Sequence, residues 1–200
     1  MHHAIAHLQR QDPVLAGIID RVGDYRIEFR DPDFETLVKS IVFQQLSGRV
    51  AGVIFGRLAA AVGGKLTPAG VLKLRPSRMR TLGLSSQKIA YIRDLARHIR
   101  DGALVFEELA GLPDAAVIER LTQVKGIGVW TVHMFLIFAL RRTDVLPTGD
   151  LGIRNAIRKA YGLEEVPTPS QVEIMAERWH PFCTVASWYL WRSLEPNANL

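Results

Sequence analysis

Apolar residues recur along most of the chain at the three- and four-residue spacing of amphipathic helices. Many of these stretches follow residues that commonly cap or start a helix. The expected starts are Asp12-Pro13, Asp33, Gly48, Thr67-Pro68, Arg75-Pro76, Ser85-Ser86, Pro113-Asp114, Val129, Asp150, Thr168-Pro169 and Pro181. No stretch alternates like a strand between turn dipeptides. The pattern predicts an all-α fold of about ten helices joined by short loops.

The helices are expected to form one unit with two helical lobes. Residues 34–140 would make a central bundle, and residues 1–33 with 141–200 would make the second lobe. Because binding sites favour the junction of two lobes, we expect a cleft between them to hold the site. We expect the chain to act as a monomer.

Composition narrows the class of protein. The chain has 200 residues, 48% of them hydrophobic, which excludes a disordered or collagen-like protein. No apolar run reaches the roughly 18 residues that a membrane span needs. The first residues lack the basic start and apolar core of a secretory signal, so we expect a cytoplasmic, nucleoid-associated protein. The net charge of +5 favours a polyanionic partner.

The chain has one cysteine, Cys183. A single thiol allows no internal disulfide, and an iron–sulfur cluster needs about four thiolates. A cysteine zinc site is equally unsupported. We expect Cys183 to be a small buried side chain.

A glycine hairpin joins two expected helices. In Val124-Lys125-Gly126-Ile127-Gly128, two glycines lie one residue apart just before a helix start. Glycines permit positive φ and a close approach of another backbone. The amide groups at the following helix N-terminus suit a phosphate, with a charge from Lys125 and a core anchor from Ile127. The alternative is a tight turn between helices that uses its glycines for packing alone.

Asp150 stands 24 positions after Gly126. Its neighbours fit a helix N-cap, and a plain capping role is the simpler interpretation. A fixed carboxylate can also stabilise positive charge on a sugar when an N-glycosidic bond breaks, and it can orient water.

The segment from Leu121 to Thr131, together with Asp144-x-x-Pro147-x-x-Asp150, resembles the helix-hairpin-helix DNA glycosylase superfamily. The resemblance covers about residues 30–195, with Lys125 where the family often has proline. It points to the DNA-3-methyladenine glycosylase II branch, in a compact form without the N-terminal β domain. It implies that Asp150, not Asp144, is the catalytic residue. Trp130 stands where the family's lyases carry lysine, which implies a monofunctional enzyme with water as nucleophile.

Two more segments carry the resemblance. Residues 34–63 resemble the family's first core helices, and we expect Gln45 to fill the gap left by a flipped base, with Leu46 as second choice and Gln44 as a structural residue. Residues 177–191 resemble the branch's last helix, in which Phe182 occupies the position of an aromatic residue facing the base. Cys183 and Thr184 depart there from the branch's Arg-Ser.

Trp130, Met134 and Phe182 would therefore form the base pocket. Aromatic faces attract cations by about 0.5–2 kcal/mol, which suits an alkylated, positively charged purine. Etheno adducts, hypoxanthine and uracil remain alternatives. His133, His180, Trp188 and Trp191 are interpreted as structural or core residues, and Lys88 and Arg93 as phosphate contacts or solvated charges.

The predicted function is removal of alkylated purines such as 3-methyladenine from damaged double-stranded DNA, with no membrane partner. A bifunctional glycosylase/lyase and a non-catalytic DNA-binding module are the alternatives. The resemblance further implies a Na⁺ or K⁺ ion on the backbone carbonyls of Thr122, Val124 and Gly126, and no other cofactor.

Overall fold

The computed structural model describes residues 1–195. Over these residues the chain contains thirteen α-helices, one 3-10 helix and no strand, so the predicted all-α fold is confirmed. None of the described helices has the length and apolar character needed to cross a membrane. The chain divides into two compact units, one of Arg30–Phe135 and one of Met1–Phe29 with Leu136–Leu200.

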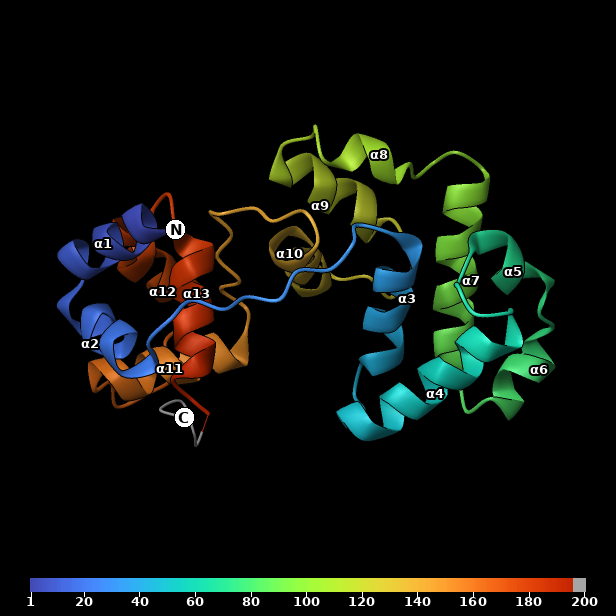
Figure 1. Cartoon of the computed structure of the whole chain (residues 1–200), viewed down its shortest axis with the longest axis horizontal. Helices are drawn as coiled ribbons and strands as arrows, with labels where there is room; N and C mark the ends of the chain where they lie inside the picture. The colour runs from blue at the N-terminus through green and yellow to red at the C-terminus, as the bar shows by residue number, and fades with distance from the viewer. Residues whose placement is uncertain (196–200) are drawn as a thin grey trace. The chain divides into compact units, whose positions relative to one another are not determined.

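The unit Arg30–Phe135 is built around one long helix. It contains α3 (Phe34–Phe43), α4 (Gly48–Ala61), α5 (Pro68–Lys73), α6 (Pro76–Thr81), α7 (Ser86–Arg100), α8 (Phe106–Leu109), α9 (Asp114–Thr122) and the first part of α10 (Val129–Phe138). Helix α7 packs against α3, α5 and α6 (Figure 1). Its buried face carries Ile89, Ile92, Leu95 and Ala96, the spacing that predicted this helix.

Side-chain caps explain where these helices begin. Asp33 accepts a hydrogen bond from the amide of Thr36, and Ser85 accepts one from the amide of Lys88. Such caps satisfy amide groups that have no partner within the helix. The helix starts predicted from these residues are confirmed.

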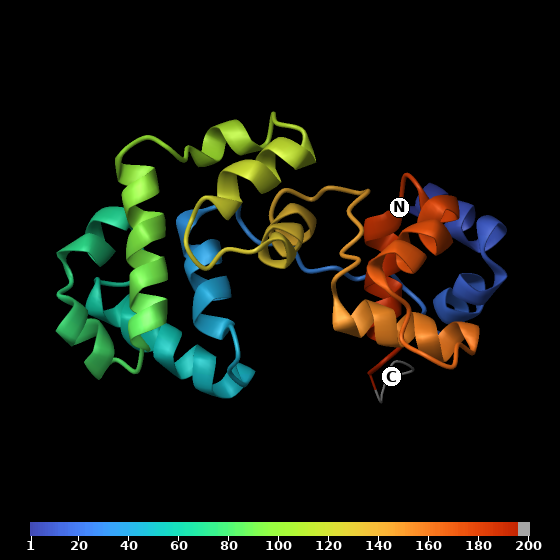
Figure 2. The ribbon, with the colours of Figure 1, turned by 180° about the vertical axis from the view of Figure 1, so that it is seen from behind.

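The second unit joins the N-terminal helices to the C-terminal ones. It contains α1 (His2–Gln11), α2 (Pro13–Val22), α11 (Leu151–Tyr161), α12 (Pro169–Ala176), η1 (Glu177–Trp179) and α13 (Cys183–Arg192). Helix α13 contacts α1, α2 and α11, and its eight residues from 183 to 190 are all buried. Seen from behind, the blue N-terminal helices lie beside the orange and red C-terminal ones (Figure 2).

A buried carboxylate ties this unit together. Asp12 caps α2 by accepting hydrogen bonds from the amides of Val14 and Leu15. Its other oxygen accepts from Trp179 Nε1 at 2.8 Å and from the hydroxyl of Tyr161. Burial raises the pKa of Asp12, but these hydrogen bonds outweigh it and hold the pKa below its usual value.

The structure departs from the predicted helices at several points. Helices α1 and α8 were not predicted, and α10 begins at the predicted Val129 and ends at Phe138. The last helix begins at Cys183, two residues after the predicted Pro181. Two apolar residues of α4, Val50 and Val53, are 48% and 51% exposed.

Candidate functional site

The glycine hairpin connects α9 to α10 and is packed firmly into its unit. Val124 and Ile127 are buried and anchor the turn, as predicted for Ile127. Gly126 has a φ of 82°, and a Cβ there would lie 2.0 Å from Cδ2 of Tyr91. Only glycine fits this position, because both the backbone and the tyrosine ring exclude a side chain.

The other hairpin glycine has a different environment. A Cβ added to Gly128 would meet no atom within 4 Å, and the residue is exposed. Val132 N donates to Gly128 O, so the intrahelical bonds of α10 begin at Gly128. The amide groups in the first turn of a helix point out of its N-terminus, where they can meet an anion.

Two hydrogen bonds hold the hairpin from the side. The amide of Lys125 donates to Asp94 Oδ2 at 2.9 Å, and Gln44 Nε2 donates to the carbonyl oxygen of Gly126 at 2.9 Å. The Lys125 side chain is exposed. Its backbone amide is therefore committed to Asp94, while its ammonium group remains at the surface.

The carbonyls expected to hold a monovalent ion partly fit that role. The oxygen of Val124 accepts from the amide of Ile127, and that of Gly126 accepts from Gln44. A carbonyl oxygen has two lone pairs, so each keeps one for an ion. The Na⁺ or K⁺ ion on these oxygens and on that of Thr122 stays a prediction.

The loop between α3 and α4 carries the predicted wedge residues. Gln45 has a positive φ of 55°, which is uncommon for a residue with a side chain. Gln45 and Leu46 are both exposed. Gln44 is structural, as predicted, and its bond to Gly126 joins this loop to the hairpin.

Lys88 and Arg93 play a role that sequence reasoning missed. Lys88 Nζ donates to the carbonyls of Val42 at 2.7 Å and Gln44 at 2.8 Å, at the end of α3. Burial lowers the pKa of Lys88. Arg93 donates in the same way to the carbonyl of Leu74, after α5. Both cations satisfy helix-end carbonyls, which corrects their interpretation as phosphate contacts or freely solvated charges.

Trp130 and Met134 lie one turn apart on α10. Trp130 is 49% exposed and Met134 is half-buried. Their spacing places both side chains on the same face of the helix. The exposed indole of Trp130 can contact a ligand, and its place in the base pocket stays a prediction.

Asp150 caps α11 and is held from two sides. Its Oδ1 accepts from the amide of Ile153 at 2.8 Å and from Trp191 Nε1 at 2.9 Å. The residue is only 8% exposed. A Cβ on Gly152 would lie 3.0 Å from Asp150 Oδ1 and 3.3 Å from Trp191 Cδ1, so this glycine leaves room for the contact. The carboxylate therefore has a defined position.

Trp191 packs against the hydrophobic core of its unit, as predicted, and it also donates to Asp150, which was not predicted. It is half-buried on α13, where its ring also stacks on Phe138. A buried indole N–H needs an acceptor, and this general rule was the only sequence signal that could have pointed to a carboxylate partner.

Phe182 precedes α13 and contacts two histidines of α1. Its ring meets the rings of His3 and His7 edge-on, with centroids 5.6 and 5.3 Å apart. Sequence reasoning missed both histidines because it did not predict α1. Phe182 belongs to the same unit as Asp150, whereas Trp130, Met134 and the hairpin belong to the other. The three-residue base pocket thus draws on both units and stays a prediction.

Comparison with known proteins gives these features a context. The family of HhH-GPD superfamily base excision DNA repair proteins matches residues 38–181. The chain is 38% identical to DNA-3-methyladenine glycosylase 1 of Schizosaccharomyces pombe, over 94% of this chain and 85% of that protein.

Solved structures agree with the sequence matches. The Schizosaccharomyces pombe 3-methyladenine DNA glycosylase in complex with abasic DNA matches with a TM-score of 0.85 over 95% of both chains, at 38% identity. A DNA-3-methyladenine glycosidase from Bacillus halodurans matches with a TM-score of 0.87, at 38% identity. That match covers 94% of this chain and 88% of the other.

Proposed function

The chain belongs to the HhH-GPD superfamily of base excision DNA repair proteins, and from this premise we propose that it is a monofunctional DNA glycosylase. Its substrate is an alkylated purine such as 3-methyladenine in damaged double-stranded DNA. The names of the relatives support this substrate class. The single observation that carries the chemistry is the fixed carboxylate of Asp150.

Asp150 stabilises the charge that develops on the sugar. As the N-glycosidic bond stretches, C1′ becomes positive. A carboxylate that is already held in place stabilises this charge without a free-energy cost for reorienting. Trp191 and the first turn of α11 provide this fixed geometry. An alkylated purine is itself cationic and a good leaving group, so the reaction needs little acid catalysis.

In this proposal water is the nucleophile. Trp130 replaces the lysine with which bifunctional relatives would form a Schiff base, and an indole has no nucleophilic amine. Lys125 precedes the glycines and serves phosphate binding. Asp150 orients or deprotonates the water that attacks the sugar.

DNA binding is assigned to the hairpin and the wedge loop. The first-turn amides of α10, with Gly126, Gly128 and Lys125, bind a backbone phosphate without reading sequence. Gln45, or failing that Leu46, fills the space of the extruded nucleotide. Their exposure and the link from Gln44 to Gly126 support this assignment.

Selectivity is assigned to Trp130, Met134 and Phe182. The aromatic rings favour a cationic base by about 0.5–2 kcal/mol. Met134 adds a polarisable contact that tolerates different bases. A Na⁺ or K⁺ ion on the carbonyls of residues 122, 124 and 126 would supply positive charge beside the phosphate. We further propose that the enzyme acts as a monomer in the cytoplasm, at the nucleoid.

The decisive experiment measures free base released from methylated duplex DNA. Asp150→Asn keeps a good N-cap residue and removes the charge, so the fold should survive while release falls sharply. Asp33→Asn makes the same change at the cap of α3 and should release base like the wild type. Equal release by Asp150→Asn and wild type would refute the catalytic assignment.

A second measurement separates the alternatives. Borohydride trapping should give no covalent adduct between the protein and DNA, and an adduct would show a lyase. Binding to a lesion duplex without any base release would identify a non-catalytic module. A panel of duplexes with alkylpurine, etheno, hypoxanthine or uracil lesions then ranks the substrates.

A further inference from the structure

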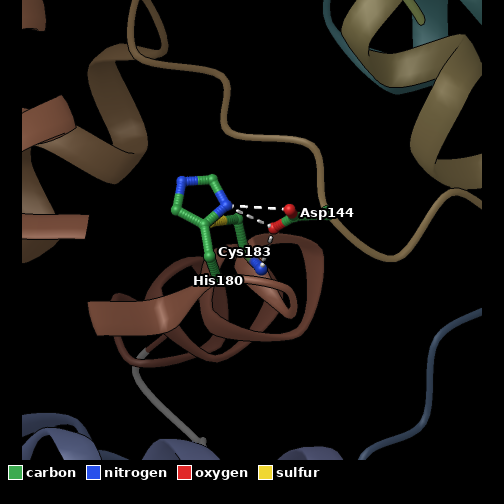
Figure 3. Close-up of side chains that lie close together, drawn as sticks. All are labelled: Asp144, His180 and Cys183. Atoms are coloured by element: carbon green, nitrogen blue, oxygen red, sulfur yellow. Dashed lines mark hydrogen bonds and ion pairs between the residues drawn. The ribbon is translucent and has the colours of Figure 1, made fainter. Parts of the chain in front are cut away.

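Three side chains with different ligating atoms converge in the unit that contains both termini. They are Asp144 from the loop before α11, His180 after η1, and Cys183 at the start of α13 (Figure 3). Their carboxylate oxygen, ring nitrogen and sulfur all lie within 4.8 Å of one another. The proposed glycosylase chemistry uses none of the three.

One ring nitrogen faces both partners. His180 Nδ1 lies 2.8 and 2.9 Å from the two oxygens of Asp144 and 3.6 Å from Cys183 Sγ. In a Cys-His-Asp catalytic arrangement, opposite ring nitrogens would contact the sulfur and the carboxylate. Here the atoms converge on one point instead, as the ligands of a metal ion do.

The distances fit a tetrahedral ion. With metal–sulfur and metal–nitrogen bonds of about 2.3 and 2.0–2.1 Å, the sulfur and nitrogen lie about 3.5 Å apart. Cys183 Sγ and His180 Nδ1 are 3.6 Å apart. The Asp144–His180 pair would open by a few tenths of an ångström, from hydrogen-bond to ligand spacing.

The carboxylate is held in position before any ion binds. Asp144 Oδ1 accepts from the amide of Cys183 at 3.2 Å. Thr184 fixes the same loop, because its amide donates to Thr143 O at 3.1 Å and its hydroxyl accepts from the amide of Val145 at 3.0 Å. The side chains of His180 and Asp144 are 49% and 36% exposed, which leaves a path from solvent.

We propose that Asp144, His180 and Cys183 bind a zinc ion, with water as the fourth ligand. Thiolate and imidazole ligands select zinc among common divalent ions. On binding, the S–H bond of Cys183 breaks and its proton passes to water as the S–Zn bond forms. His180 binds as the neutral ring with its one proton on Nε2 and its Nδ1 lone pair on the ion, so a proton on Nδ1 moves to Nε2 through water, or passes to water where both ring nitrogens carry one.

Sequence reasoning missed this site because it considered only sites made of cysteines. Asp144 lies 36 positions from His180 and 39 from Cys183, and the fold alone brings them together. The ion would fasten the loop before Asp150 to the start of α13, the helix that carries Trp191. This ion would be separate from the monovalent ion proposed at the hairpin.

The test titrates the whole chain, freed of metal, with Co²⁺. A thiolate bound to Co²⁺ gives a charge-transfer band in the near ultraviolet, and Cys183 is the only cysteine. We expect one Co²⁺ per chain with this band, and displacement of the Co²⁺ by Zn²⁺. Because changes outside the ligand set already cost about 10–100-fold in metal affinity, losing a ligand should weaken binding by more than about 100-fold.

Three variants and one control make the outcome definite. Cys183→Ser should abolish the band. Asp144→Asn and His180→Gln keep the thiol and should weaken Co²⁺ binding, so a folding defect caused by loss of the thiol cannot explain their effect. A His2→Gln/His3→Gln variant removes two exposed histidines that could bind metal adventitiously, and it should keep the band. Co²⁺ binding without the band, or a band of unchanged affinity in Asp144→Asn and His180→Gln, would overturn the proposal.

Discussion

Replacing each hairpin glycine by alanine should separate the hairpin's folding role from its DNA-binding role. A Cβ at residue 126 would lie 2.0 Å from the ring of Tyr91, whereas carbon atoms in contact lie about 3.5–4.0 Å apart. A shift of the ring would also disturb the hydrogen bond that its hydroxyl accepts from Gln87 Nε2 at 2.6 Å. Overpacking costs about 1–3 kcal/mol and the positive φ about 1–2 kcal/mol, so Gly126→Ala should cost about 2–5 kcal/mol.

Thermal denaturation measures this cost. In a chain of this size each kcal/mol lowers Tm by about 2–4 °C, so we expect a loss of roughly 4–20 °C for Gly126→Ala. Adding Tyr91→Ala should recover the steric part and leave the backbone strain. Gly128→Ala meets no atom within 4 Å and should melt like the wild type.

Gly128→Ala should weaken DNA binding, although it should leave the melting temperature unchanged. A methyl group there would stand where we place the phosphate, and losing charge-assisted hydrogen bonds of about 1.5–3 kcal/mol weakens binding about 10- to 100-fold. Fluorescence anisotropy with a labelled duplex containing an abasic site measures the change. Wild-type affinity in a folded Gly128→Ala variant would refute our placement of the phosphate, and wild-type melting of Gly126→Ala would refute the packing argument.

Three further predictions concern polar contacts. Trp191→Phe removes the N–H donor to Asp150, so base release should fall about 10-fold or more while Tm changes little. Single-turnover kinetics measure the rate of release, and an unchanged rate would contradict this prediction. The lowered pKa of Asp12 adds stability above about pH 4 that is lost as pH falls through the folded-state pKa. Asp12→Asn should therefore flatten the acid side of the urea-unfolding pH profile, and an identical slope would contradict this. Lys88→Met should destabilise the chain by about 1–3 kcal/mol in urea unfolding, because it leaves the carbonyls of Val42 and Gln44 without their cation, and unchanged stability would argue against a capping role.

Local signals predicted most helices of this protein. A cap such as Asp33 or Ser85 acts on amides two or three residues away, so its effect can be seen in the sequence itself. Helices α1 and α8 have no side-chain cap at their N-termini. Helix α1 depends instead on burying Ala4 and Leu8 against the rest of its unit, which a local pattern does not contain.

The candidate site was only partly predictable for the same reason. The N-cap position of Asp150 followed from its neighbours, and the structure confirms it. Its contact with Trp191 spans 41 positions, and the bond from Lys88 to Val42 spans 46. Such pairs form only when helices pack, so sequence reasoning gave these residues other roles.

The bond from Gln44 to Gly126 connects residues 82 positions apart, and it bears on how the enzyme searches a genome. A repair protein meets vastly more intact base pairs than lesions and must test each one quickly. Since the bond links the loop between α3 and α4 to the hairpin, in our proposal the wedge residue and the phosphate-binding amides move together along the backbone. On these proposed roles, the two segments need no rearrangement between tests, and weakened pairing at a lesion is itself the signal to stop.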